Sequence, residues 1–438
     1  MWRQLMERLK EWQASPRRKP LVLRGVRQCG KTWLLREFGR TRYAQTAYFN
    51  FERQPRLGGL FEGELDTGRL LAALGALHGS KLTPGDTLVV FDEIQECPAA
   101  LSSLKYFCEE APDIHVAAAG SLLGVTLAGT GGFPVGKVNF LELRPLSFGE
   151  FLAAQEQGLS AYLEALADLS PLPEAVAGRL ERHFRDYLAL GGMPEVLAAW
   201  HAKQDYQEAE AIQREILQSY ELDFAKHAPK ADIPKLFLLW KSIPAQLARA
   251  HGKFLYGQAK SGARAHDLED ALRWLQEAGL VCRVNRIERP GTPPSAYVDA
   301  KSFKLYLADT GLLRQMARVP LEAIALSPDV FGEFKGRLAE NFVSQELRAV
   351  QDEELYYWSS GNVAELDFML PHPKGLLPVE VKSGTNPKSQ SLRVYREKHG
   401  PPLALRFSLL NLRHEGSLLN VPLYLVHQLP RLLKLAGL

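Results

Sequence analysis

One segment near the start of the chain has the residue types and spacing of a phosphate-binding loop. The apolar run Leu21–Leu23 leads into Gly25-x-x-x-x-Gly30-Lys31-Thr32, and apolar residues at helical spacing follow. This strand–loop–helix order is typical of a P-loop, or Walker A motif, whose glycines turn backbone N–H groups toward phosphate. Lys31 can reach the β and γ oxygens and Thr32 can hold Mg²⁺. The sequence therefore predicts binding of ATP with Mg²⁺. The residues expected to line this site are Gly25, Val26, Arg27, Gln28, Cys29, Gly30, Lys31, Thr32 and Trp33.

A pair of carboxylates follows a second apolar strand. Thr87–Phe91 leads directly into Asp92 and Glu93, about sixty residues after the P-loop. Such a Walker B pair suits hydrolysis, because Asp92 can complete the Mg²⁺ shell and Glu93 can polarise the attacking water. Ser121 ends the next predicted strand. It is expected either to sense the γ-phosphate or to cap the following helix.

A third group of polar residues lies in the last quarter of the chain. Asp367 precedes Glu380-Val-Lys382, and Glu340 lies upstream on a predicted helix. Glu380 and Lys382 share one face of a strand because side chains alternate. The two strands would bring Asp367, Glu380 and Lys382 to one edge, and Glu340 could add a fourth polar group, so a chemical site there is one prediction. The alternative is a Glu380–Lys382 surface pair in a domain used for binding or assembly.

The P-loop and the Asp92-Glu93 pair require a sheet that brings strand ends together. Residues 1 to about 155 alternate strand-like and helix-like segments, which is the signature of a parallel α/β sheet. The predicted strands are Leu21–Arg24, Ala47–Phe51, Thr87–Phe91, Ile114–Ala119 and Lys137–Leu143. We expect residues 1–155 to form a P-loop nucleotide-binding domain.

The rest of the chain is predicted to contain three further parts. Residues 156–233 read as a helical lid or linker, in which Gly191–Pro194 ends one helix and starts another. Residues 234–320 give three helices and a β-hairpin, the order of a winged helix-turn-helix. Residues 321–438 give one helix, strands, a second helix and a further strand, the order of a small α/β domain.

The winged helix would offer a basic surface whose recognition helix begins near Ala265. Its basic residues are Lys253, Lys260, Arg264, His266, Arg273, Arg283, Arg286 and Arg289. Such a cluster suits contacts with DNA phosphates. The same helix also carries Asp267, Glu269 and Asp270, which repel phosphate, so a structural or protein-binding role is the alternative.

Overall composition narrows the class of protein. The 438 residues include 53 Lys or Arg and 50 Asp or Glu, so the total charge neither requires nor excludes a nucleic-acid partner. The four cysteines form no CxxC pair and no zinc-type cluster, which favours a reducing cytoplasm. The first residues form a charged amphipathic helix rather than a signal peptide, and no apolar stretch reaches membrane-spanning length. We expect a cytoplasmic protein with no membrane contact.

Several of these segments resemble a known family. GxRQxGKT, FDEIQ, AGS and RPLSFGEF look like the prokaryotic AAA+ ATPases grouped with the archaeal-type ATPases, whose C-terminal half is a domain of unknown function. Tyr187–Glu195 and Leu307–Leu312 also fit this pattern. The family usually has a Gly-Arg pair where this chain has Gly136 and Lys137, so Lys137 or Arg144 would have to supply any arginine-finger function.

The C-terminal pattern resembles a second group. Glu340, Asp367 and Glu380-x-Lys382 are similar to the PD-(D/E)XK phosphodiesterases, especially the resolvase-like members. The resemblance implies a restriction-endonuclease-like fold in which two carboxylates bind a divalent metal and the lysine orients water. The candidate metal ligands here are Glu340, Asp367 and Glu380, and Lys382 is the lysine, so the resemblance also implies cleavage of phosphodiesters.

These predictions combine into two alternatives. The first is an ATP-hydrolysing AAA+ protein that couples nucleotide state to a DNA-binding and possibly DNA-cleaving C-terminal region. The second is a signalling or regulatory ATP switch that binds a protein partner, does not hydrolyse ATP rapidly and has an inactive nuclease-like domain. Another copy of the chain is a further candidate partner. A metabolic kinase is disfavoured by the Asp92-Glu93 strand end and the downstream domains.

Overall fold

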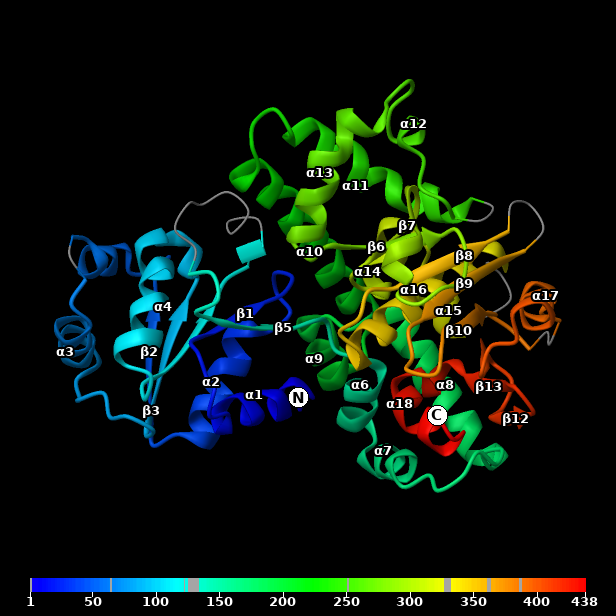
Figure 1. Ribbon diagram of the computed structural model, residues 1–438, viewed down its shortest axis with the longest axis horizontal. Coiled ribbons are helices and arrows are strands. Elements are labelled where there is room, and N and C mark those ends of the chain that lie inside the picture. The colour runs from blue at the N-terminus through cyan, green and yellow to red at the C-terminus, as the bar shows by residue number, and fades with distance from the viewer. Residues whose placement is uncertain are drawn as a thin grey trace. The chain divides into compact units, whose positions relative to one another are not determined.

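The computed structural model describes residues 2–63, 65–121, 123–124, 134–249, 252–326, 332–360, 364–385 and 388–438. The chain divides into two compact units (Figure 1). The first contains residues 1–144 with 277–279, and the second contains residues 145–276 with 280–438. The segments that the sequence assigns to a lid, a winged helix and a C-terminal domain thus fall largely within one unit.

The first unit is built on a parallel sheet, as the sequence predicts. Its strands are β1 (Leu21–Arg24), β2 (Gln45–Asn50), β3 (Thr87–Asp92), β4 (His115–Ala119) and β5 (Asn139–Glu142). Their order is β2-β3-β4-β1-β5, and each pair is parallel. This order sets β4 between β1, which leads into the P-loop, and β3, which ends at Asp92. Because the strands are parallel, their carboxyl ends lie at one edge.

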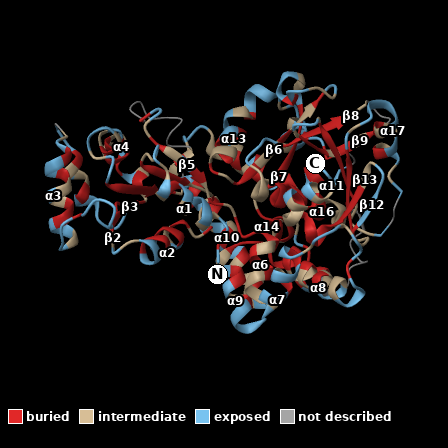
Figure 2. Ribbon diagram, turned by 60° about the horizontal axis from the view of Figure 1, so that its bottom comes forward, coloured by how far each residue is buried: buried red, intermediate tan, exposed pale blue. Residues whose placement is uncertain are grey.

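Helices cover both faces of this sheet. They are α1 (Leu5–Ala14), α2 (Lys31–Arg42), α3 (Thr67–His78) and α4 (Pro98–Glu110), with short 3₁₀ turns η1 (Pro55–Phe61) and η2 (Ile94–Glu96). On one face, Phe91 of β3 packs against Phe107 of α4, with ring centres 5.9 Å apart. Trp12 of α1 packs against Phe38 of α2 at 6.3 Å. Figure 2 shows the strands as the buried centre of this unit.

The second unit contains a mixed sheet of eight strands. They are β6 (Val281–Ile287), β7 (Val298–Leu307), β8 (Tyr356–Ser359), β9 (Glu365–Leu370), β10 (Leu377–Val381), β11 (Ala404–Ser408), β12 (Arg413–Glu415) and β13 (Leu418–Pro422). The order is β12-β13-β11-β10-β9-β8-β6-β7. The predicted wing hairpin, β6 and β7, is therefore one edge of the same sheet as the C-terminal strands. It joins that sheet through parallel pairing of β6 with β8, for example Asn285 with Tyr356.

Helices pack around this sheet and beside it. They are α6 (Phe148–Gln155), α7 (Gln157–Glu164), α8 (Glu174–Leu190), α9 (Pro194–Lys203), α10 (Tyr206–His227), α11 (Ile233–Ala248), α12 (Tyr256–Ala259), α13 (Ala265–Glu277), α14 (Thr310–Met316), α15 (Leu321–Leu326), α16 (Gly332–Val350), α17 (Gln390–His399) and α18 (Leu429–Leu435), with 3₁₀ turns η3 (Pro294–Tyr297) and η4 (Leu423–Gln428). Phe342 of α16 packs on Phe184 of α8, with ring centres 4.9 Å apart. Tyr395 of α17 packs on Trp358 of β8 at 5.0 Å. In the described part of the chain, no helix combines the length and hydropathy needed to cross a membrane.

Two of the family-like segments meet inside this unit. Asp309, which is fully buried, accepts hydrogen bonds from the backbone N–H groups of Gly192 and Leu312. A Cβ on Gly311 would lie 2.3 Å from the carbonyl oxygen of Leu190, so only glycine fits there. The Gly-Gly segment after α8 and the Asp-Thr-Gly segment before α14 are therefore a structural junction.

Candidate functional site

The P-loop has the backbone shape that a phosphate site needs. Gly25 and Gly30 adopt φ of 145° and 95°, and Gly30 precedes the first turn of α2. A Cβ on Gly25 would lie 2.1 Å from the carbonyl oxygen of Leu143, which explains why glycine is required. Val26 and Cys29 are buried, and the Cys29 thiol lies 3.4 Å from the same carbonyl. The side chains of Val26 and Cys29 therefore pack inward, which leaves only their backbone to face a nucleotide.

Lys31 is the first residue of α2, and its side chain turns back into the loop. Its ammonium donates hydrogen bonds to the carbonyl oxygens of Gly25 and Val26, both at 2.9 Å. Of the other predicted residues, Arg27 is half-buried, Gln28 is exposed, and Trp33 is 46% exposed on the first turn of α2. An exposed aromatic ring beside the loop is available to a ligand.

Arg3 supports the loop from the N-terminal segment, which sequence analysis missed. Its buried guanidinium donates to the carbonyl oxygen of Cys29 at 2.9 Å and also to that of Arg144. A single arginine before an amphipathic helix gives no signal in the sequence that it reaches the P-loop.

Thr32 and Asp92 meet where the loop approaches the end of β3. The Thr32 hydroxyl donates to Asp92 Oδ2 at 2.8 Å. Hydroxyl, carboxylate and water oxygens are the ligands that Mg²⁺ prefers, so this pair fits the ion that the sequence predicts. Tyr48 and Asn50, both missed by sequence analysis, also donate to Asp92 Oδ2, at 2.5 and 3.5 Å. Burial, together with the hydrogen bond to Asp92, raises the pKa of Tyr48 above its ordinary value.

Glu93 is held by two neighbours. Gln95 Nε2 donates to Glu93 Oε2 at 2.6 Å, and the Ser121 hydroxyl lies 3.5 Å from Glu93 Oε1. A Cβ on Gly120 would lie 1.9 Å from the Gln95 amide oxygen, so a glycine before Ser121 leaves room for Gln95. The structure thus brings Ser121 and Glu93 together. It also adds Gln95, for which the FDEIQ segment was the only signal in the sequence.

The two candidates for an arginine finger both have carboxylate partners. Lys137 forms an ion pair with Glu109 at 2.8 Å, and Arg144 forms one with Glu142 at 2.7 Å. The Lys137 side chain is 41% exposed, whereas that of Arg144 is 19% exposed. Lys137 is the more accessible of the two.

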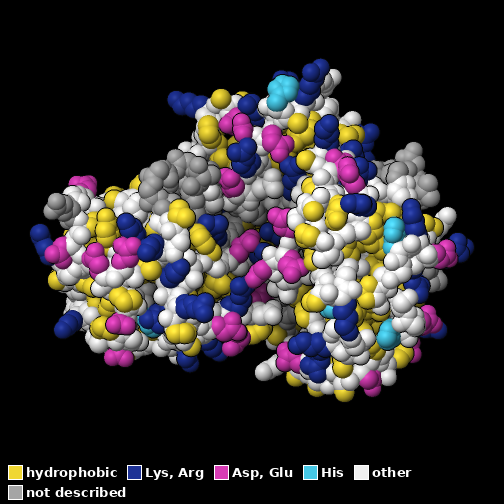
Figure 3. All heavy atoms as spheres, viewed as in Figure 1, with side chains coloured by type: hydrophobic (Ala, Val, Ile, Leu, Met, Phe, Trp, Pro, Cys, Tyr) yellow, Lys and Arg dark blue, Asp and Glu magenta, His cyan; other side chains and the backbone are white. Residues whose placement is uncertain are grey.

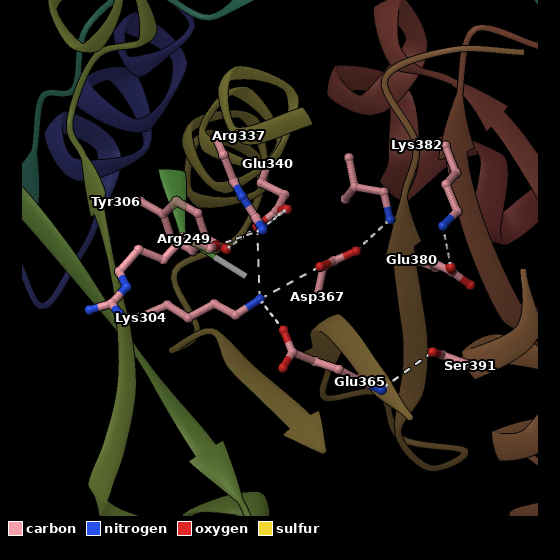
Figure 4. A network of polar contacts seen from close by, with 11 residues as sticks. Arg249, Lys304, Tyr306, Arg337, Glu340, Glu365, Asp367, Glu380, Lys382 and Ser391 are labelled. Atoms are coloured by element: carbon pink, nitrogen blue, oxygen red, sulfur yellow. Dashed lines mark hydrogen bonds and ion pairs between the residues drawn. The ribbon is translucent and has the colours of Figure 1, made fainter. Parts of the chain in front are cut away.

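The four predicted C-terminal residues divide between two sets of contacts. Glu340 lies on α16, Asp367 on β9 and Glu380 on β10, and Lys382 follows the end of β10. Glu380 pairs with Lys382 at 2.7 Å, and its second oxygen accepts a hydrogen bond from the backbone N–H of Leu392 on α17. Asp367 Oδ2 accepts from the backbone N–H of Val381 at 2.8 Å. Figure 4 shows Glu380 with Lys382 to one side, and Asp367 turned toward a different lysine.

That lysine is Lys304 on β7, which sequence analysis did not single out. Its side chain is 0% exposed, and its ammonium lies 2.7 Å from Glu365, 3.6 Å from Asp367 and 3.8 Å from Glu340 (Figure 4). We call Lys304, Glu340, Glu365 and Asp367 the Lys304 cluster. A lysine on a predicted wing gives no sequence signal of burial, because its carboxylate partners lie 36 or more residues downstream.

Two further side chains bind Glu340 of the Lys304 cluster. Arg337 pairs with Glu340 Oε1 at 2.6 Å, and the Tyr306 hydroxyl donates to Oε2 at 3.0 Å. Burial, and then the charge of Glu340, raise the pKa of Asp367 to about 7. Burial alone would lower the pKa of Lys304, but the three carboxylates outweigh it and raise that pKa above its ordinary value. Within the described ranges, no group of three or more His, Cys, Asp or Glu side chains is arranged to hold a metal ion.

Three arginines of the predicted DNA-binding surface are paired with acids. Arg283 pairs with Glu269 at 2.6 Å and Arg286 with Asp299 at 2.7 Å. Arg273 lies 3.3 Å from Asp270 on the same helix. These ion pairs neutralise part of the positive charge that the sequence offers there.

One protein-family model matches the part of the chain that contains the P-loop. Residues 17–152 match the AAA domain family. Residues 181–323 match a domain of unknown function, DUF8612, and residues 335–424 match another, DUF4143. No curated protein matches the sequence.

Solved structures give distant similarities. The chain is similar to a Walker-type ATPase of Pyrococcus abyssi, with 14% identity over 71% of this chain and 94% of that one and a TM-score of 0.45. It is also similar to the Aeropyrum pernix ORC1 protein in complex with DNA (15% identity, 74% and 95% covered, TM-score 0.28) and to AMPPCP-bound DnaA from Aquifex aeolicus (12%, 62% and 86%, 0.29). By the family matches, the chain contains an AAA domain over residues 17–152, followed by two regions that match families of unknown function.

Proposed function

We propose that this protein is an ATP-hydrolysing switch whose nucleotide state controls how the second unit binds a partner. The observation that carries the proposal is the convergence of three strand ends in the first unit. Thr32 meets Asp92 at 2.8 Å, and Glu93 lies between Gln95 and Ser121. This arrangement supplies a phosphate cradle, a pair of Mg²⁺ ligands and a carboxylate that can act on water.

Each residue then has a distinct role. Lys31 exchanges its loop carbonyl partners for the β and γ oxygens of ATP. Mg²⁺ held by Thr32 and Asp92 would neutralise charge that develops on the phosphates. Glu93 orients a water and accepts its proton as the water oxygen bonds to the γ-phosphorus. The bond from that phosphorus to the bridging oxygen of ADP breaks in the same step, so ADP and phosphate leave. Gln95 acts as a positioning residue for Glu93, and Ser121 is placed to respond to the γ-phosphate.

The observed charges favour a protein partner over DNA. Contacts with DNA phosphates need basic side chains that are available to replace counterions. Arg273, Arg283 and Arg286 instead face carboxylates. Figure 3 shows basic and acidic side chains interspersed where Figure 1 places α11, α12 and α13. This mixed surface suits a folded, charge-complementary partner.

DNA cleavage, which the sequence raises for Asp367, Glu380 and Lys382, is not part of this proposal. Asp367 and Glu340 face Lys304, whereas Glu380 is engaged by Lys382. Incubation with branched and linear DNA plus Mg²⁺ or Mn²⁺ is expected to give no product. Cleavage that disappears in Asp367→Ala would restore the nuclease alternative.

The rate of ATP hydrolysis with and without DNA tests the proposal. We expect hydrolysis that Lys31→Ala abolishes and that duplex DNA changes by less than about twofold. A matched variant, Lys19→Ala, alters a lysine outside the loop that donates to the Gly136 carbonyl, and it should keep the wild-type rate. Absence of ATP hydrolysis would contradict the switch. Strong stimulation by DNA that falls steeply with salt would make DNA the partner.

A further inference from the structure

We propose that the ammonium of Lys304 is the resident cation of the C-terminal carboxylate cluster and stands where the nuclease resemblance would place a divalent metal. That resemblance implies a metal held by Glu340, Asp367 and Glu380. The residues present at this C-terminal site do not fit such an ion. The proposed role of Lys304 is independent of nucleotide hydrolysis in the first unit.

The ammonium of Lys304 lies among the implied metal ligands. Its nitrogen lies 3.6 Å from Asp367 and 3.8 Å from Glu340, so it stands close to two of the three implied ligands. It also contacts Glu365, a third carboxylate outside the predicted set, at 2.7 Å. A metal bound between Asp367 and Glu340 would need the space that the ammonium fills, as Figure 4 illustrates.

Positive side chains already face the carboxylates of the Lys304 cluster. Three carboxylates face Lys304, and Arg337 adds a second positive charge at Glu340. The two cations offset most of the negative charge of the three carboxylates, so little charge remains to attract a divalent ion. The Lys304 side chain is 0% exposed, so its charge is balanced by these carboxylates and not by water.

Glu380, the third implied ligand, is bound by other groups of the chain. One oxygen of Glu380 pairs with Lys382 and the other accepts from the Leu392 N–H group. Both oxygens are therefore occupied by protein donors. Asp367 Oδ2 is likewise bound by the Val381 N–H group. The carboxylates that the resemblance assigns to a metal serve instead to connect β7, β9, β10 and α16.

Binding of Mn²⁺ to the full chain without nucleotide tests this proposal, with Mn²⁺ counted by electron paramagnetic resonance. We expect wild type and Asp367→Asn to bind the same number of ions, because the wild-type cluster takes none. Glu340→Gln repeats this comparison at a second ligand. Loss of one site per chain in either variant would overturn the proposal.

Removal of the lysine gives the complementary arm. Lys304→Met leaves the three carboxylates with Arg337 as their one remaining cation, so we expect it to gain one Mn²⁺ site per chain and to lose that site again when combined with Asp367→Asn. Lys382→Met is the matched control, since it removes a lysine that pairs with a single carboxylate, and it should gain none. A folded Lys304→Met variant that binds no additional Mn²⁺ would contradict the proposal. Where Lys304→Met does not fold, the comparison between wild type and Asp367→Asn decides.

Discussion

Glu93 shows how single residues are prepared for chemistry in the first unit. Its φ of 50° is a left-handed conformation that costs a glutamate about 1 kcal/mol, so the surrounding contacts must hold it there. Gln95 and Ser121 contact its two oxygens. A carboxylate fixed in this way has little freedom to turn away from an attacking water.

Gln95→Ala tests that positioning role. Loss of the hydrogen bond to Glu93 should lower kcat about tenfold. KM for ATP should stay within about twofold, because the proposed role of Gln95 is to position Glu93 and not to bind the phosphates. Steady-state kinetics measure both constants. Glu96→Ala, an exposed neighbour on the same 3₁₀ turn, should retain wild-type values. A rise in KM with unchanged kcat would assign Gln95 to nucleotide binding instead.

At the scale of elements, the junction between α8 and α14 fixes the second unit. Asp309 joins the Gly192 and Leu312 N–H groups, and Arg314, also fully buried, donates to the Ala189 carbonyl at 3.1 Å. These contacts satisfy backbone groups at a helix end and a helix start, which would otherwise be buried without partners.

Gly311→Ala is expected to weaken this junction. Its Cβ would lie 2.3 Å from the Leu190 carbonyl oxygen, so the free energy of unfolding should fall by about 2 to 4 kcal/mol. Gly178→Ala is the matched control, because Gly178 is an exposed position of α8 with nothing within 4 Å of an added Cβ, and it should gain about 0.5 to 1 kcal/mol. Urea unfolding measures both. Equal effects in the two variants would show that the junction is not tightly packed.

The contact between α16 and α6 predicts a pH dependence. Glu346 on α16 accepts a hydrogen bond from the Phe148 N–H group at 2.8 Å, and burial raises its pKa to about 8. The folded state therefore keeps a proton that the unfolded chain releases near 4.5, so stability should fall as pH rises from about 5 to 8. Glu346→Gln should remove this part of the pH profile in thermal unfolding. An unchanged profile in the variant would show that Glu346 is ionised in the fold.

At the scale of the whole molecule, the eight-stranded sheet joins segments that the sequence separates. β6 and β7 lie in the region that matches DUF8612, whereas β8 to β13 lie in the region that matches DUF4143. The parallel pairing of β6 with β8 and the contacts of Lys304 both cross that division. These two regions therefore share one core.

Separation of these regions should consequently fail. A fragment of residues 332–438 lacks β6, β7 and Lys304, so β8 loses one of its two partner strands and Glu340, Glu365 and Asp367 lose the lysine they share. We expect this fragment to be insoluble or to unfold without cooperativity, while residues 145–438 give a cooperative transition in calorimetry. A fragment of residues 332–438 that is as stable as residues 145–438 would contradict the shared core.

Sequence patterns predict the first unit better than the second for a physical reason. The P-loop, Asp92 and Glu93 lie on local motifs whose neighbours in sequence fix their surroundings, and the five strands appear within two residues of their predicted ends. The Lys304 cluster depends instead on pairing between β7 and distant strands. A lysine and its carboxylates, 36 to 63 residues apart, give no periodic signal of that contact.

ATP turnover by Glu93→Gln tests whether this protein is an ATPase that uses Glu93 as its base. The variant keeps the shape of the side chain and removes the base, so we predict ATP affinity within about threefold of wild type and kcat reduced by about a hundredfold or more. Binding by calorimetry and phosphate release measure the two quantities. Hydrolysis at the wild-type rate, or loss of ATP binding, would contradict the role of Glu93 and with it the proposed ATPase switch.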